Sequence, residues 1–188
     1  NLNNSGTLFS FNPTNNAFST LVNFNGTTLG GAPYGGVIEV NNKLYGTTNF
    51  GGTNNYGTIY SVDMSTGTHS VLASFTGSVG VTIGAKAKNS LIYANGLLYG
   101  TAANSGLSGD YGVVFSIDPT TNTYSTVINF NGTNGGNPYG NLLHASNGNL
   151  YGMTYSGGFA SAGTLFEYNL ATNTHSVLTN FNNTNGGN

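Results

Sequence analysis

Few side chains in this sequence could act as acids, bases or metal ligands. The chain has five acidic residues, three histidines and no cysteine. Asp63 and Asp118 would be the first candidates for a catalytic carboxylate pair, but they occupy equivalent turn positions in two segments of similar sequence, where two further segments carry Asn12 and Asn169. A short side chain at this position accepts a hydrogen bond from the backbone two residues further on. We therefore interpret Asp63 and Asp118 as turn residues.

Glu39 and Glu167 are the other acidic candidates. They belong to different strands of the repeating unit, and nothing in their spacing brings them to the separation that a pair of glycosidase carboxylates requires. His144 occupies the position of Glu39 in another copy of the unit and is expected to face solvent. We predict no catalytic, cofactor-binding or metal-binding residue, and no enzyme activity. A hydrolase or lyase would need convergent acidic or histidine side chains, and turnover that is abolished by removing Asp110 or Glu167 would support it.

The remaining histidines share one position of the repeating unit. His69 and His175 align with Phe18 and Tyr124 in the other copies. A position that accepts phenylalanine, tyrosine and histidine requires a flat ring, whereas a metal site requires the ligating nitrogen itself. We predict that both histidines pack as rings.

Tyrosines recur once per unit and leave two interpretations open. Tyr45, Tyr99 and Tyr151 occupy one position, and Tyr34 and Tyr139 share another. Rows of exposed tyrosines would suit a polysaccharide, with Tyr45, Tyr99 and Tyr151 as the glycan contacts. The alternative is that these rings pack within the sheets, with each hydroxyl bonded to the backbone.

Three asparagines begin triplets that match the N-glycosylation acceptor. Asn25, Asn131 and Asn182 lie in equivalent loops and are each followed two residues later by threonine. Glycosylation at these three residues is therefore a hypothesis, although such triplets also arise by chance in a chain so rich in asparagine.

All of these positions belong to a tandem repeat. Segments that align without gaps begin at Gly6, Gly57, Gly112 and Gly163, so about 3.5 units of about 51 to 55 residues follow one another. Such a period indicates one supersecondary unit that buries its apolar surface against its neighbours.

Each unit is predicted to form four short antiparallel strands. Apolar and aromatic residues alternate over short runs that Gly, Asn and Pro interrupt, and no helical period is present. Two-residue turns are predicted at 41–42, 95–96 and 147–148, where Asn-Asn or Asn-Gly favours a type I′ hairpin. We predict an all-β, β-propeller-like array of four-stranded blades similar to kelch blades.

We assign residues 1–188 to a single tandem-repeat domain with blades at about 35–75, 81–130 and 139–181. Residues 1–24 then form an N-terminal half-blade that lacks a strand pair. The array is therefore expected to be open, part of a larger assembly, or completed head to tail by another molecule, which would build filaments.

The composition excludes several partners. Only 4% of the residues are charged, against about 25% in an ordinary soluble domain. Lys43, Lys86 and Lys88 are the only basic residues, so binding to nucleic acid is not expected. No apolar run approaches the ~18 residues of a membrane span, so membrane insertion is not expected either. Aromatic residues, 11 Phe and 12 Tyr, are numerous enough to build a core.

The repeat motif resembles the GloVer family, the Gloeobacter and Verrucomicrobia repeat of bacterial secreted proteins. The hallmark Leu-Tyr-Gly-Thr-Thr, then Gly-Gly and Gly-Thr-Val-Phe, is matched closely over 44–60 and with substitutions over 98–115 and 150–166. Ala102, Ser105 and Asp110 depart from the motif. The resemblance covers essentially the whole chain and implies an exported bacterial protein, without implying a reaction.

These observations favour a non-catalytic structural or adhesive protein, extracellular or on the bacterial cell surface. Its expected partners are other repeats or other copies of the chain, in a filament built by strand complementation. The alternative is a carbohydrate-binding propeller module.

Overall fold

A computed structural model describes residues 5–182 and 184–186. Residues 1–4 of the predicted half-blade therefore lie outside the described residues, as do 183, 187 and 188. Within the described residues all regular structure is β, and this part of the chain contains no helix long and apolar enough to cross a membrane.

The strands form one hairpin and three four-stranded meanders, and every pairing is antiparallel. The bounds of the strands in chain order are β1 Thr7–Asn12, β2 Ala17–Asn23, β3 Ile38–Val40, β4 Lys43–Thr47, β5 Thr58–Asp63, β6 His69–Ser74, β7 Ile92–Ala94, β8 Leu97–Ala102, β9 Val113–Ile117, β10 Tyr124–Asn129, β11 Leu143–His144, β12 Leu150–Thr154, β13 Thr164–Asn169 and β14 Thr174–Asn180. The predicted all-β, β-propeller-like architecture is confirmed.

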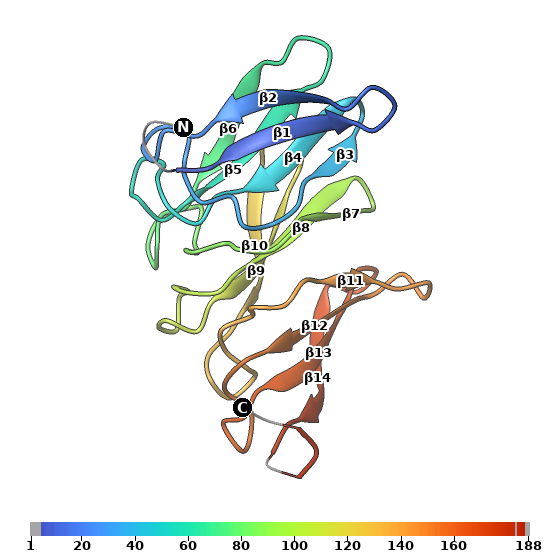
Figure 1. The fold of residues 1–188 in the computed structure, drawn as a ribbon. Helices are drawn as coiled ribbons and strands as arrows, with labels where there is room; N and C mark the ends of the chain where they lie inside the picture. The colour runs from blue at the N-terminus through green and yellow to red at the C-terminus, as the bar shows by residue number, and fades with distance from the viewer. Residues whose placement is uncertain (1–4, 183, 187–188) are drawn as a thin grey trace.

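The four sheets follow one another in a row from the hairpin β1–β2 to the sheet β11–β14 (Figure 1). The first strands of the complete sheets, β3, β7 and β11, are neighbours. Hydrogen bonds tie the segments that lead into them: Gly36 N donates to Ser90 Oγ (2.9 Å), and Ser90 N donates to Asn141 Oδ1 (3.1 Å). The row is therefore held at one edge by a ladder of short polar contacts.

The outer hairpins share one turn. In all four copies the side-chain oxygen of the residue at its first position accepts a hydrogen bond from the backbone N–H two residues on; the acceptors are Asn12, Asp63, Asp118 and Asn169. The turn interpretation of Asp63 and Asp118 is thus confirmed. Each hairpin also carries an irregular register at the same place, and a bulge there increases the local twist of the strand pair.

One predicted turn is wrong. Asn41 and Asn42, like Asn95 and Gly96, have positive φ at both central residues, as a type I′ turn requires. Between β11 and β12, however, three residues separate Ala145 from Asn149, and only Gly148 has positive φ. This copy has one residue more between the paired strands, so a longer turn with glycine in the left-handed region closes it.

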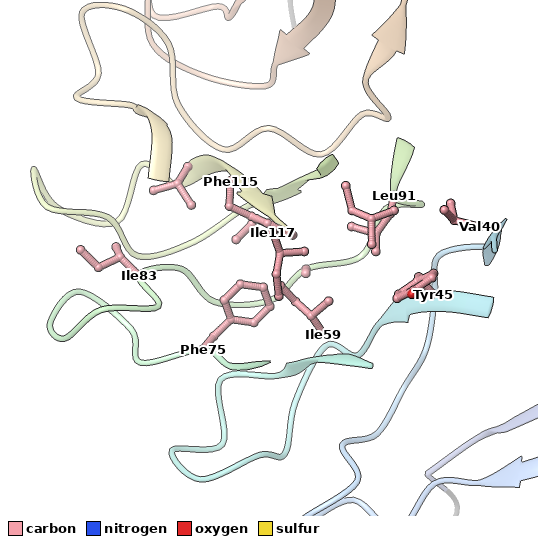
Figure 2. Packing of buried hydrophobic residues seen from close by; sticks show 12 residues of the cluster. Val40, Tyr45, Ile59, Phe75, Ile83, Leu91, Phe115 and Ile117 are labelled. Atoms are coloured by element: carbon pink, nitrogen blue, oxygen red, sulfur yellow. The ribbon is translucent and has the colours of Figure 1, made fainter. Parts of the chain in front are cut away.

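The core lies between successive sheets. Figure 2 shows the cluster between β3–β6 and β7–β10, where Tyr45, Ile59 and Phe75 of the first sheet face Phe115 and Ile117 of the second. A second cluster joins β7–β10 to β11–β14, and a smaller one joins the hairpin to β3–β6. Each sheet therefore buries its apolar residues on its neighbours, as the repeat period predicts.

Candidate functional site

Three aromatic clusters join each sheet to the next. In each, a phenylalanine that follows the last strand of one sheet contacts the ring on the third strand of the next sheet, with centroids 5.1 to 5.3 Å apart and planes 62° to 66° apart. A third ring lies beside this pair on the fourth strand. We call these clusters aromatic joints; they consist of Phe24, Tyr60 and His69, of Phe75, Phe115 and Tyr124, and of Phe130, Phe166 and His175.

A glycine on the second strand of each complete sheet makes room for the joint. A Cβ atom at Gly46, Gly100 or Gly152 would lie 2.5 Å from the ring of Tyr60, Phe115 or Phe166, respectively. The ring therefore lies directly on the neighbouring strand. This contact explains the glycine of the Leu-Tyr-Gly motif, because any side chain would displace the ring.

The N-terminal hairpin carries the same rings without their cover. Phe9 and Phe18 correspond to Phe115 and Tyr124, and they stack on each other with centroids 5.2 Å apart. Phe9 is 55% exposed and Phe18 61%, whereas Phe115 is fully buried. Phe11 is exposed as well, and among the described residues β1 pairs only with β2. The hairpin thus presents half of an aromatic joint beside an unpaired strand edge.

Cavities lie where this hairpin meets the next sheet. One of about 250 Å³ is bounded by Phe9, Pro33 and Tyr60, and another of about 290 Å³ is bounded by Leu21 and Leu44, among other residues. The contact between the hairpin and β3–β6 therefore leaves space that side chains do not fill.

The other end of the row carries the complementary half of a joint. Phe181 follows β14 as Phe130 follows β10, and it is half-buried. The loop after it repeats the earlier loop: Asn182 N donates to Asn185 Oδ1 (2.7 Å), as Asn131 N donates to Asn134 Oδ1 (2.9 Å). The loop after Phe181 therefore has the same local hydrogen bonds as the loop after Phe130, which leads into the next sheet.

The structure places the tyrosines proposed for glycan contact within the sheets. Tyr45 is 3% exposed and Tyr99 5%, and both belong to the clusters between sheets. Tyr151 is half-buried, and its hydroxyl donates to Glu167 Oε1 (2.6 Å) and accepts from Asn147 Nδ2 (2.7 Å). The rings of Tyr45 and Tyr99 are packed and have no open face for a sugar. The Tyr151 hydroxyl, however, bonds to side chains and not to the backbone as the packing interpretation expects.

The histidine position holds flat rings, as the sequence predicts. His69 lies 5.5 Å from Tyr60 and 5.8 Å from Phe24, centroid to centroid. Burial lowers the pKa of His69, and it does the same for His175 in its joint. Neither nitrogen of His69 has a hydrogen-bond partner among the described residues. His144 is exposed. In the described chain, no three His, Asp or Glu side chains gather closely enough to hold a metal ion.

The carboxylates are engaged locally. Glu39 Oε1 accepts a hydrogen bond from Asn42 N (3.0 Å) in its own turn. The pKa of Glu167 is lowered by hydrogen bonds, chiefly the one from Tyr151 and secondly the one from Asn149. Glu39 and Glu167 belong to different sheets. Asp110 closes the loop in which the third copy departs from the motif, with bonds from Ser105 N (2.5 Å) and Asn104 Nδ2 (3.0 Å).

The asparagine side chains of the acceptor triplets accept hydrogen bonds within their own loops. Asn25 Oδ1 accepts Thr27 N (3.0 Å), and the Asn131 and Asn182 side chains accept both the N–H and the hydroxyl of the threonine two residues on. Asn131 and Asn182 are exposed, and Asn25 is half-buried. Their modification stays a prediction.

One cluster was not found from the sequence. Tyr139 and Tyr155 meet edge to face with centroids 5.6 Å apart, and the Lys88 ammonium group lies 5.5 Å from the centre of the Tyr139 ring. The recurrence of Tyr34 and Tyr139 was the only signal. Tyr139 precedes β11 and Tyr155 follows β12 of the same unit, whereas Lys88 belongs to the preceding unit, so the pairing of β11 with β12 and the packing of successive sheets bring the three together.

Meanders of four strands packed in a row, with their first strands adjacent, define a β-propeller-like repeat protein. The chain belongs to the Gloeobacter/Verrucomicrobia repeat family, whose model matches residues 1–188. No protein with a curated description matches this sequence.

Solved structures share the fold at low identity. TolB from Acinetobacter baumannii is similar with a TM-score of 0.57 and 13% identity, over 93% of this chain and 38% of that one. The extracellular domain of BT4673 from B. thetaiotaomicron has a TM-score of 0.61 and 14% identity, over 93% and 20%. An ulvan lyase, a polysaccharide lyase, has a TM-score of 0.53 and 13% identity, over 79% and 39%. The chain thus spans less than half the length of each.

Proposed function

We propose that this protein is a non-catalytic structural repeat protein of the bacterial cell surface or extracellular matrix, and that its copies associate head to tail. The observation that carries the proposal is the uncovered ring pair Phe9–Phe18 on the N-terminal hairpin. In this arrangement, Phe181 of one copy packs on that ring pair of the next copy and builds a fourth aromatic joint.

The repeated joints support this choice of partner. The same edge-to-face contact occurs three times in the chain, with centroid distances that differ by only 0.2 Å. A copy of the chain supplies the ring, the loop and the sheet face that this contact uses. Because the surface of one end differs from that of the other, such contacts propagate into filaments unless a rotation closes them.

The placement of the polar groups supports a non-catalytic role. The carboxylates of Asp63, Asp118 and Glu167 accept hydrogen bonds within their own turn or strand pair, and His69 and His175 are packed as rings. Their structural roles account for them without a reaction. Contacts made by rings and backbone are also little screened by salt, which suits a protein outside the cell.

Variants at the two ends test the association. We expect the wild-type protein to form filaments or large oligomers by light scattering and negative-stain microscopy. Phe9→Ser/Phe18→Ser and Phe181→Ser should each abolish them, because each removes half of the joint. An equimolar mixture of the two variants should form heterodimers, since each keeps the half that the other lacks.

Phe159→Ser is the matched control, because Phe159 is 97% exposed on a loop outside the joints. It should leave the oligomers unchanged. A wild-type protein that stays monomeric at high concentration would rule out the proposal, as would variants at the ends that assemble normally. Circular dichroism would confirm that each variant is folded.

Carbohydrate binding is the second candidate function. The observation that favours it is the exposed pair Tyr139–Tyr155, rather than the buried Tyr45 and Tyr99.

A further inference from the structure

We infer that Lys88, Tyr139 and Tyr155 form a binding site for an acidic polysaccharide, one that contains uronic acid residues. We call these three residues the tyrosine platform. The inference does not depend on head-to-tail association, because the platform is outside the aromatic joints and the N-terminal hairpin.

The rings of the platform are open to solvent. Tyr139 is 44% exposed and Tyr155 54%, and their planes are inclined by 68°. Tyrosine combines a flat apolar face with a hydroxyl, and it is favoured at binding surfaces for that reason. With the two rings at such an angle, one sugar can stack on the face of one ring, and the next sugar can form a hydrogen bond with the hydroxyl of the other ring.

The backbone around the platform is held in place by other hydrogen bonds. Asn89, next to Lys88, donates from Nδ2 to Gly140 O (3.0 Å) and to Thr101 Oγ1 (2.7 Å). Tyr155 N donates to Asn137 O (3.1 Å). The segments of two successive units are therefore fixed relative to one another before any ligand arrives, which lowers the entropic cost of binding.

The charge at the platform selects an acidic ligand. Lys88 lies beside the Tyr139 ring, and Lys86, two residues earlier, is exposed on the same loop. Asp110 lies on the loop that joins β8 to β9, at the same end of the sheets, but both of its oxygens accept hydrogen bonds from Ser105 and Asn104. A carboxylate on a stacked sugar can therefore pair with Lys88.

The site extends along the row of sheets. Three successive units carry Tyr34, Lys88 and Tyr139 at the same position. Tyr34, in the first of these units, is 67% exposed. Gly35, next to it, lies against the backbone of Asn89, where an added Cβ would be 2.5 Å from the carbonyl oxygen. Exposed side chains of three successive units thus form a line, which fits a polymer better than a single sugar.

Binding of polygalacturonic acid, compared with neutral dextran, tests the inference by affinity electrophoresis and titration calorimetry. We expect the wild-type protein to bind the acidic polymer. Tyr139→Ala/Tyr155→Ala should weaken binding at least ~10-fold, which corresponds to about 1.4 kcal/mol. Lys88→Ala should also weaken it, and Lys88→Arg should retain it.

Lys43→Ala and Tyr93→Ala are the matched controls, since one removes the same charge and the other a ring that is 39% exposed on β7. Both should bind like the wild type. Absence of binding by the wild type would overturn the inference, and so would equal loss in the controls. Binding of dextran as strong as that of polygalacturonic acid would overturn the role of Lys88.

Discussion

One ring position shows how a single residue serves the packing of a whole unit. Phe18, His69, Tyr124 and His175 stand there in the four copies. Tyr124 stacks on Phe115 and donates its hydroxyl to the carbonyl of Ile83, so the polar atom finds a partner. Histidine fills the same space but has two nitrogens to satisfy, and burial disfavours its charged form. The position therefore tolerates histidine only while it is neutral.

The neutral histidines make stability depend on pH. Because burial lowers the pKa of His69 and His175 below 6.5, the unfolded state binds protons more strongly. Their contribution to stability is present above about pH 6.5 and is lost as the pH falls below it. We expect the urea midpoint of the wild type to be lower at about pH 5 than at about pH 7.5.

His69→Phe/His175→Phe should reduce this difference, since Phe18 shows that phenylalanine occurs at the position. The carboxylates with lowered pKa, Asp63, Asp118 and Glu167, stay ionised over this range and contribute little to the change. An unchanged pH dependence in the double variant would show that other groups cause it.

At the scale of the element, paired strands are joined by matched side chains at their ends. Thr154 Oγ1 and Thr164 Oγ1 lie 2.9 Å apart, and Thr48 and Thr58 form the same buried pair. In the third copy Ala102 and Val113 replace both members. Because valine replaces the threonine opposite Ala102, no buried hydroxyl is left without a partner at this position of the third copy. The departure of Ala102 from the family motif is therefore compensated across the strand pair.

This pair predicts a non-additive effect. Thr154→Ala leaves the buried Thr164 hydroxyl unpaired and should cost about 1 to 3 kcal/mol in the free energy of unfolding. Adding Thr164→Val should restore part of that loss, because the double variant recreates the apolar pair Ala102–Val113. Urea unfolding of both single variants and the double variant measures the coupling. Simple addition of the two losses would contradict the explanation.

At the scale of the molecule, each sheet depends on its neighbours. Phe75 is fully buried between Phe115 and Tyr124 in the central joint, whereas Phe181 is only half-buried at the end of the row. Repeat proteins distribute their stability between units and the interfaces of nearest neighbours. An inner joint therefore contributes more to stability than a half-joint at an end.

Phe75→Ala and Phe181→Ala compare the two cases. We expect Phe75→Ala to cost about 3 to 5 kcal/mol and to separate unfolding of the two halves of the row. In the dissociated chain Phe181→Ala should cost less than about 1 kcal/mol, since within one copy Phe181 belongs to no complete joint. Thermal unfolding followed by calorimetry measures both. Equal losses would mean that the sheets do not depend on their joints in this way.

Much of the fold could be predicted because its signals are local. The period, the alternation of apolar residues and the side chains of the outer turns depend on residues close in sequence, and the structure agrees with them at Asp63 and Asp118. The turn before β12 was mispredicted because Asn-Gly favours a two-residue turn, while the pairing of Leu143 with Tyr151 leaves room for a longer one. Strand register, a tertiary property, decided it.

The order of the residues is enough to show that the chain is a β repeat and which positions carry rings. Which of those rings are covered follows from the packing of the sheets, because burial depends on whether another sheet lies over them. Phe9 and Phe115 occupy the same position of the unit, yet one is 55% exposed and the other fully buried. Lys88 and Tyr139 meet for the same reason, since packing of successive sheets brings together side chains of different units.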